Sequence, residues 1–140
     1  MKTIVVGVDG SEHGEAALAF AAQEAALRGA RLLVVCAWES SAVIAPIAAA
    51  YPAESFEVFR DSAESIARAA VARVAELQPS VACEGKAVEG RPAEVLPKEA
   101  EQADMIVVGN RGRGGFASLL LGSVTQHVVH HAPCPVVVVR

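Results

Sequence analysis

Glycines and a serine near the carboxyl terminus have the types and spacing of a phosphate-binding loop. Gly109 follows the apolar run 105–108, Gly112 comes three residues later, and Gly122-Ser123 opens a segment with helical periodicity. Glycine lets a backbone reach positive φ and approach a ligand closely. The N–H groups of a first helical turn, with the helix dipole behind them, favour an anion. This stretch therefore predicts a phosphate cradle, although the glycines by themselves also fit a tight structural turn.

A carboxylate closes the first apolar run of the chain. Residues 2–9, KTIVVGVD, have the pattern of a buried parallel strand that ends in Asp9. In a parallel sheet a ligand binds beyond the carboxyl ends of the strands, where the winding direction reverses. If the strand at 104–109 lies beside the first strand, Asp9 and the glycine loop face one crevice. The sequence pattern leaves that adjacency open, and an acid after a strand can also be a helix N-cap.

A histidine cluster near the carboxyl terminus offers a second kind of chemistry. His127, His130 and His131 precede Cys134, and His127 and His131 share one helix face, which suits a metal. Histidines are also favoured near a helix carboxyl terminus by the dipole, and the sequence holds no second cluster of ligands. We therefore predict a structural cluster and no metal-binding residue. No Ser-His-Asp or Cys-His arrangement can be defended from the spacing, so no catalytic residue is assigned.

Strands and helices alternate along the chain. Apolar runs predict strands at 2–9, 31–38, 81–88, 104–109 and 135–139, and helical periodicity predicts helices at 12–28, 54–78, 90–101 and 123–131. The third strand is more polar than the others, which favours an edge position. Residues 39–53 fit neither period and predict a surface crossover that could act as a flap. The alternation predicts an α/β fold whose parallel sheet has helices on both faces.

Composition limits the classes of function. The 140 residues suit one domain, and no apolar run reaches the ~18 residues of a membrane span. The first residues lead directly into a strand pattern, which argues against a signal peptide, and Cys36, Cys83 and Cys134 fit reduced core thiols. A net charge of −4 argues against nucleic acid as a partner. We expect a cytoplasmic protein without a membrane partner.

The spacing Gly109-x2-Gly112-x9-Gly122-Ser123 resembles the nucleotide-binding signature of the universal stress protein family. The opening IVVGVDGS, the middle GRPAEVL and the closing APCPVVVVR resemble further segments of the family in the same order, so the resemblance covers almost the whole chain. It implies one domain over residues 1–140 with a Rossmann-like fold. That fold is a five-stranded parallel sheet in the order 3-2-1-4-5, similar to the adenine nucleotide alpha hydrolases.

The resemblance also implies a site for ATP, with Mg²⁺ accompanying the phosphates. Asp9 matches the carboxylate on the adenosine side, and Ala37 matches the residue whose backbone meets adenine. The other positions that it implies as nucleotide contacts are Val8, Val108, Gly109, Gly112, Arg113, Gly122, Ser123 and Val124. Asn110 and Arg111 fall at variable positions of the motif and are not assigned.

As a function, the resemblance implies a nucleotide-dependent stress-response regulator or sensor that forms a homodimer through its C-terminal strand. No dedicated general base is visible, so we expect no enzyme activity beyond slow ATP hydrolysis or autophosphorylation. An interaction module of the same fold that binds no nucleotide is the alternative from another class. A dedicated ATP-cleaving enzyme is a third, although Asp9-Gly10-Ser11-Glu12 lacks the SGGxDS loop of the ATP-pyrophosphatase relatives. The sequence names no protein partner.

Overall fold

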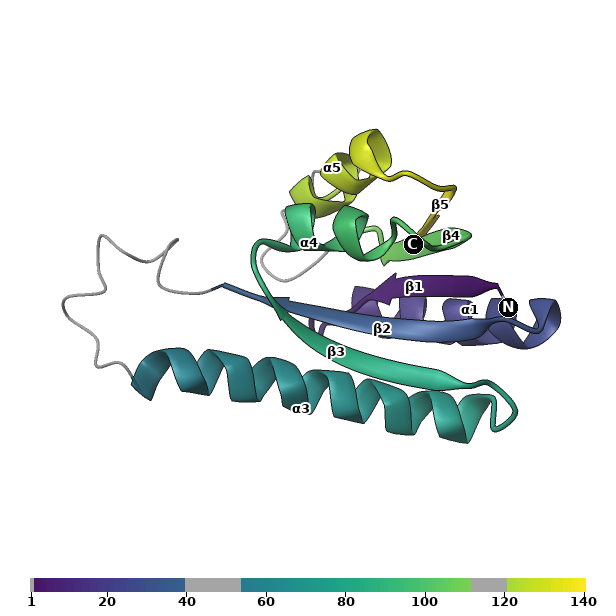
Figure 1. The fold of residues 1–140 in the computed structure, drawn as a ribbon, viewed down its shortest axis with the longest axis horizontal. Helices are drawn as coiled ribbons and strands as arrows, with labels where there is room; N and C mark the ends of the chain where they lie inside the picture. The colour runs from purple at the N-terminus through teal and green to yellow at the C-terminus, as the bar shows by residue number, and fades with distance from the viewer. Residues whose placement is uncertain (1, 40–53, 112–120) are drawn as a thin grey trace.

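A five-stranded parallel sheet forms the centre of the fold in a computed structural model, which describes residues 2–39, 54–111 and 121–140. Its strands are β1 (Thr3–Gly7), β2 (Arg31–Trp38), β3 (Cys83–Glu89), β4 (Met105–Gly109) and β5 (Val136–Val139). They lie in the order β3-β2-β1-β4-β5, which confirms the order that the family resemblance implies (Figure 1). β1 and β4 are therefore neighbours, and the more polar β3 is an edge strand, as predicted.

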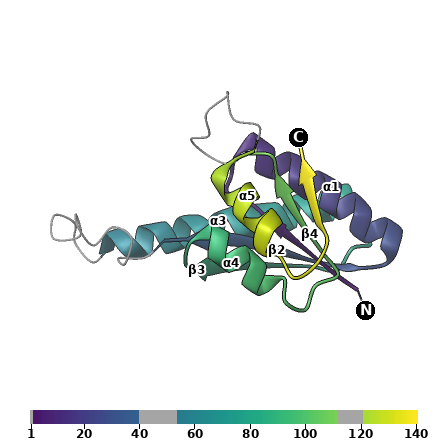
Figure 2. The same cartoon turned by 90° about the horizontal axis from the view of Figure 1, so that it is seen from above.

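Helices cover both faces of this sheet (Figures 1 and 2). They are α1 (Glu12–Arg28), α3 (Glu54–Leu77), α4 (Pro92–Glu99) and α5 (Ser123–His131). Val6 packs in one core cluster with α1 and α3, whereas the preceding Val5 packs in another with α4 and α5. Successive strand residues point to opposite faces, so the near-continuous apolar strands supply both cores.

The ends of α1 follow directly from its sequence. The Ser11 hydroxyl accepts a hydrogen bond from the Gly14 N–H, and Gly29 ends the helix at φ 62°. The predicted stripe of Leu18, Ala21, Ala22 and Ala25 is buried against the sheet. Its three alanines let the helix lie close to β1 and β4, which brings its first turn to the carboxyl ends of those strands.

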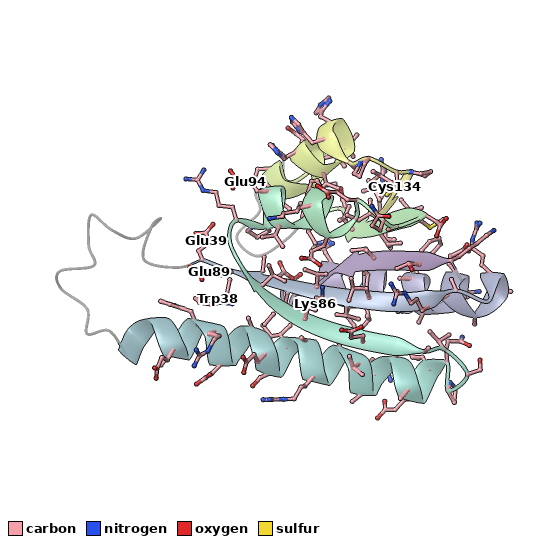
Figure 3. All side chains as sticks on the ribbon, in the orientation of Figure 1. Trp38, Glu39, Lys86, Glu89, Glu94 and Cys134 are labelled. Carbon is pink, nitrogen blue, oxygen red and sulfur yellow. The ribbon has the colours of Figure 1, made fainter. Side chains whose placement is uncertain are left out.

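Element boundaries differ from the sequence prediction near the sheet edge. β3 begins at Cys83 rather than at residue 81, and α4 is shorter than the predicted 90–101. Gly90, at φ 138°, donates its N–H to the Trp38 carbonyl at 2.8 Å, which turns the chain from β3 into α4. Figure 3 shows Trp38 and Glu89 together at this end of the sheet, where they are register partners. Pro97 lies inside α4, which ends two residues later.

No helix among the described residues is both long and apolar enough to cross a membrane. The proposed flap at 39–53 lies almost wholly outside the described residues, as do Gly112 and Arg113. The flap and the nucleotide contacts of Gly112 and Arg113 therefore stay predictions.

Candidate functional site

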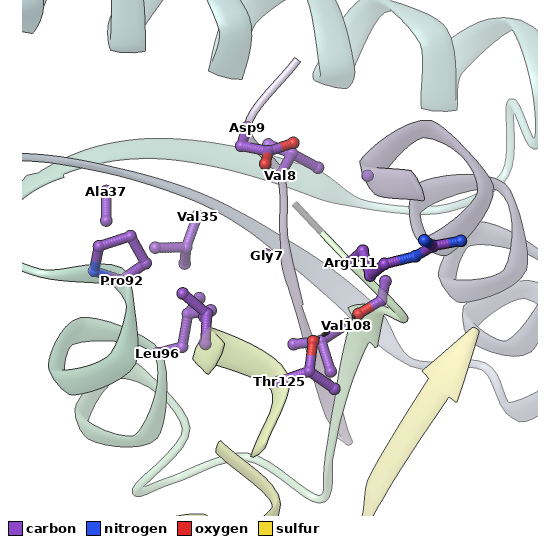
Figure 4. A pocket seen from close by; sticks show the side chains of 13 residues that line it. Gly7, Val8, Asp9, Val35, Ala37, Pro92, Leu96, Val108, Arg111 and Thr125 are labelled. Carbon is purple, nitrogen blue, oxygen red and sulfur yellow. Dashed lines mark hydrogen bonds between the residues drawn. The ribbon is translucent and has the colours of Figure 1, made fainter. Parts of the chain in front are cut away.

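A pocket lies at the carboxyl ends of β1, β2 and β4, where the sheet reverses its winding direction (Figure 4). Six elements supply its walls, because the helices α1, α4 and α5 all approach the ends of these three strands. Its lining consists of Gly7, Val8, Asp9, Gly14, Val35, Ala37, Pro92, Leu96, Val108, Gly109, Arg111, Val124 and Thr125. This is the position at which open parallel sheets bind ligands.

Most of the residues assigned from the sequence meet at this pocket. Six of them line it, namely Val8, Asp9, Ala37, Val108, Gly109 and Val124. Gly122 and Ser123 stand beside it at the start of α5 without lining it, and Ser123 is exposed. The adjacency of Asp9 and the start of the glycine loop, which the sequence pattern left open, follows from the pairing of β1 with β4.

The backbone of Ala37 faces the pocket. Along β2, Arg31 donates to the Lys2 carbonyl and Val35 accepts from the Val8 N–H at 3.0 Å, so alternate residues of this strand bond toward β1. Ala37 continues that series. The bond from Val8 is the last of this ladder among the described residues, because β1 ends at Gly7 and the chain turns away into α1. The Ala37 N–H and carbonyl therefore point into the crevice.

Asp9 shapes the turn that leads into α1. Its Oδ1 accepts hydrogen bonds from the Ser11 N–H at 2.9 Å and the Ser11 hydroxyl at 2.5 Å. Ser11 is the N-cap of α1, so Asp9 is not the residue that caps this helix. A Cβ on Gly14 would lie 3.1 Å from Asp9 Oδ1, so the bare glycine gives the carboxylate room against the first turn of α1. The carboxylate is held at the pocket wall.

Three hydrogen bonds hold the start of the glycine loop in place. The Thr125 hydroxyl donates to the Gly109 carbonyl at 2.7 Å, and the Asn110 N–H donates to the Val139 carbonyl at 2.6 Å. These two groups belong to one peptide unit. The next carbonyl, of Asn110, accepts from the Gly122 N–H at 2.9 Å. β4, β5 and α5 are thereby joined at the point where the loop begins and returns.

The amino terminus of α5 offers backbone donors. Gly122 is the N-cap and has no side chain to accept from the first turn. The first N–H groups of a helix have no intrahelical acceptor, and the dipole favours an anion there. The N–H of Gly122 itself is used on Asn110. The donors that α5 can offer to a ligand are therefore those of the residues that follow Gly122.

Some pocket residues were missed by the sequence reasoning. Arg111 falls at a variable position of the motif, yet it lines the pocket (Figure 4). Thr125 is 3% exposed, and its position two residues after Gly122-Ser123 was the only available signal. Pro92 and Leu96 come from α4 and carry no sequence signal for binding. Only the fold brings that helix to the site.

The histidine cluster has a different geometry from a metal site. The rings of His127 and His131 are stacked, with centroids 4.0 Å apart, and His131 Nδ1 lies 2.9 Å from the His127 carbonyl. Within the described ranges, no group of three or more His, Cys, Asp or Glu side chains is placed to hold a metal ion.

Two cysteines have raised pKa values. Burial raises the pKa of Cys83 to about 11, and burial together with the charge of Asp104 raises the pKa of Cys134. Both thiols therefore stay protonated at neutral pH.

Similar sequences are found over the whole chain. The model of the universal stress protein family matches residues 1–140. A universal stress protein of Thermus aquaticus is 40% identical over 141 residues, which cover 99% of this chain and 98% of that protein. One of Mycobacterium bovis is 37% identical over 137 residues, which cover 98% of this chain and 45% of that protein. The chain thus spans about half the length of the mycobacterial relative.

Solved structures share the fold. The universal stress protein UspA from Lactobacillus plantarum matches with a TM-score of 0.84 at 27% identity, over 99% of this chain and 97% of that one. A universal stress protein in complex with cAMP matches with a TM-score of 0.72 at 32% identity, over 99% and 96%. One from Archaeoglobus fulgidus in complex with dAMP matches with a TM-score of 0.74 at 25% identity, over 100% and 98%. With the family model matched from end to end, this chain belongs to the universal stress protein family.

Proposed function

We propose that this chain binds ATP in the pocket at the ends of β1, β2 and β4 and acts as a nucleotide-dependent stress-response regulator. The observation that carries the proposal is the backbone of Ala37, whose N–H and carbonyl point into the crevice beside Asp9. An adenine edge presents a ring-nitrogen acceptor and an amino donor, which complement those two groups. The family members solved with cAMP and dAMP support an adenine nucleotide as the ligand.

The remaining parts of ATP have suitable surroundings. The ribose hydroxyls are donors, and the Asp9 carboxylate at the pocket wall is an acceptor for them. The phosphates would lie toward the amino terminus of α5, over the loop that begins at Gly109 and returns at Gly122. There, backbone N–H groups and the helix dipole favour negative charge. Arg111, which lines the pocket, adds a positive charge.

Magnesium fits as the companion of the phosphates. Asp9 is the only carboxylate among the described residues that line the pocket. Mg²⁺ prefers octahedral oxygen ligands and commonly keeps several waters, with few protein ligands and substrate phosphates completing the shell. Mg²⁺ held mainly by phosphate oxygens and water is consistent with that donor set.

Chemical turnover is expected to be slow. The described lining offers one carboxylate as a general base, and its Oδ1 already accepts from the Ser11 N–H and hydroxyl. A base engaged in this way is poorly placed to activate water for phosphoryl transfer. Multiple-turnover assays of phosphate release with ATP and Mg²⁺ test this. Turnover at about 1 s⁻¹ or faster, the range of dedicated kinases, would make the protein an enzyme instead.

The decisive experiment asks whether the purified protein carries or binds adenine nucleotide. Mass spectrometry of the denatured protein detects released nucleotide, and calorimetric titration of the emptied protein with ATP and ADP measures affinity. We expect Asp9→Ala to weaken ATP and ADP alike, because it acts on the adenosine side. Ser123→Ala should cost ~1–2 kcal/mol of binding free energy, since backbone donors remain. A folded wild type that binds neither nucleotide would leave the interaction module as the function.

Gly122→Val tests the phosphate side of the site. Gly122 is buried at the N-cap, so a branched side chain there should disturb the helix start where the phosphates would bind. We expect ATP to lose more affinity than ADP, with circular dichroism as the folding control. If folded Gly122→Val binds ATP as the wild type does, the motif is a structural turn.

A further inference from the structure

We propose that helix α4 forms the wall against which the base of the bound nucleotide lies, with Pro92 and Leu96 as the contacts that favour a purine. This inference rests on the proposed function and adds to it the residues that select the base. It concerns a helix that neither the glycine signature nor Asp9 points to.

The two residues share one side of α4. Pro92 is the first residue of the helix and Leu96 follows one turn later, so their side chains lie on the same face. Both line the pocket, as do Val35 and Ala37 of β2. In Figure 4 these four residues gather at one end of the pocket, and their side chains are all hydrocarbon.

The position of Leu96 is set by a glycine on β1. A Cβ on Gly7 would lie 2.8 Å from Leu96 Cδ1, so Leu96 occupies the space that any larger residue on β1 would need. Leu96 is 5% exposed, which fixes it between the sheet and its own helix. The entry to α4 is also tied to the pocket, since the Gly90 N–H donates to the carbonyl of Trp38, the neighbour of Ala37. The wall is therefore held against β1 by Leu96 and joined to β2 by the hydrogen bond of Gly90.

The chemistry of this wall suits a flat ring. Proline has no N–H and leucine offers only C–H groups, so the wall binds by burial of apolar area and not by hydrogen bonds. A bicyclic purine buries more area there than a single pyrimidine ring. The polar side chains of the lining, Asp9, Arg111 and Thr125, lie apart from this end in Figure 4 and are left for the ribose and phosphates.

The test compares Leu96→Ala with Val95→Ala. Val95 is the matched control, because it is 6% exposed on the same helix but packs toward Gly90 and does not line the pocket. Calorimetric titrations with ATP, CTP and tripolyphosphate separate the base from the phosphates. We expect Leu96→Ala to lower the affinity for ATP on the order of tenfold. It should also reduce the preference for ATP over CTP and leave tripolyphosphate unchanged, whereas Val95→Ala keeps the wild-type preference.

Pro92→Ala provides the same comparison with less risk to folding, since Pro92 is half-buried at the helix start. It should also reduce the preference for ATP over CTP. If the wild type prefers ATP but both wall variants keep that preference, or if Val95→Ala reduces it equally, the wall is wrong while the proposed function stands. A wild type that binds no nucleotide overturns both.

Discussion

At the scale of single residues, the pocket owes its shape to short polar side chains bonded to backbone groups. Ser11 caps α1 while it donates to Asp9, and Thr125 fixes the Gly109 carbonyl from the first turn of α5. Each bond ties a strand end to the helix that follows it. A residue can therefore matter to the site without touching a ligand, and binding data alone do not separate the two roles.

The structural role of Thr125 can be measured through protein stability, without a ligand. Thr125→Val keeps the shape of the side chain but leaves the Gly109 carbonyl without the hydroxyl that donates to it at 2.7 Å. We expect a loss of about 1–2 kcal/mol in the free energy of unfolding, measured by urea denaturation. Thr125→Ser keeps the hydroxyl and should recover most of it. Equal stability of the valine and serine variants would show that the hydrogen bond contributes nothing.

Cys83 gives a pH-dependent prediction. Burial raises its pKa from 9.0 to about 11, so the folded protein keeps the thiol protonated where the unfolded chain ionises. The contribution of the protonated Cys83 thiol to the free energy of unfolding is complete below about pH 9, and it is lost as the pH rises through 11. Wild type should therefore lose more stability than Cys83→Ala between pH 8 and 10.5 in urea titrations. Parallel losses in the two proteins would refute this.

At the scale of elements, the site depends on how closely β4 approaches α1. A Cβ on Gly109 would lie 2.7 Å from the carbonyl oxygen of His13, in the first turn of α1. This glycine is thus required by packing, whatever it does for phosphate. Loss of nucleotide binding in a Gly109 variant would not by itself identify a phosphate contact.

Gly109→Ala should therefore destabilise the fold. A clash with backbone cannot be relieved by a side-chain rotation, so we expect a cost of about 1–3 kcal/mol in urea denaturation. Gly29→Ala is the comparison, because its added Cβ meets nothing within 4 Å and only the φ of 62° is strained. That variant should cost about 1 kcal/mol. A Gly109→Ala protein as stable as Gly29→Ala would mean that β4 and α1 can separate readily.

At the scale of the whole molecule, β5 is an edge strand, and none of the other described strands pairs with its outer side. Val137 and Val139 pack against one core cluster and Val136 and Val138 against the other, so both faces of the strand are partly covered by the fold. The backbone edge of β5 is the part that no other described strand covers. We propose that a second copy of the chain pairs with it in a two-fold dimer.

Val138→Pro tests this dimer. The Pro135 carbonyl accepts from Ile106 of β4, and the Val139 carbonyl accepts from Asn110, the residue after β4. By alternation, the polar groups of Val138 face away from β4. Proline there removes an outward N–H and spares the β4–β5 ladder. We expect wild type and Val138→Ala to be dimers by light scattering and Val138→Pro to be a monomer. A monomeric wild type at micromolar concentration would rule the dimer out.

The sequence by itself determined the elements and their order along the chain. Near-continuous Val and Ile runs are typical of strands buried on both faces, and Ser11, Gly29 and Gly122 mark helix ends through local backbone chemistry. The order of the strands came from the family resemblance and not from the pattern. Apolar runs and helix-end residues depend on only a few neighbouring residues, which is why the sequence alone predicts them.

Only the tertiary structure decided which distant residues share the site. The pairing of β1 with β4 brings Asp9 to the glycine loop. Because β1 ends at Gly7, the Ala37 backbone of the neighbouring strand faces the crevice. The place of Leu96 depends on a missing side chain on β1, 89 positions earlier in the chain. Such contacts depend on packing between elements rather than on local preference, so no pattern along the chain contains them.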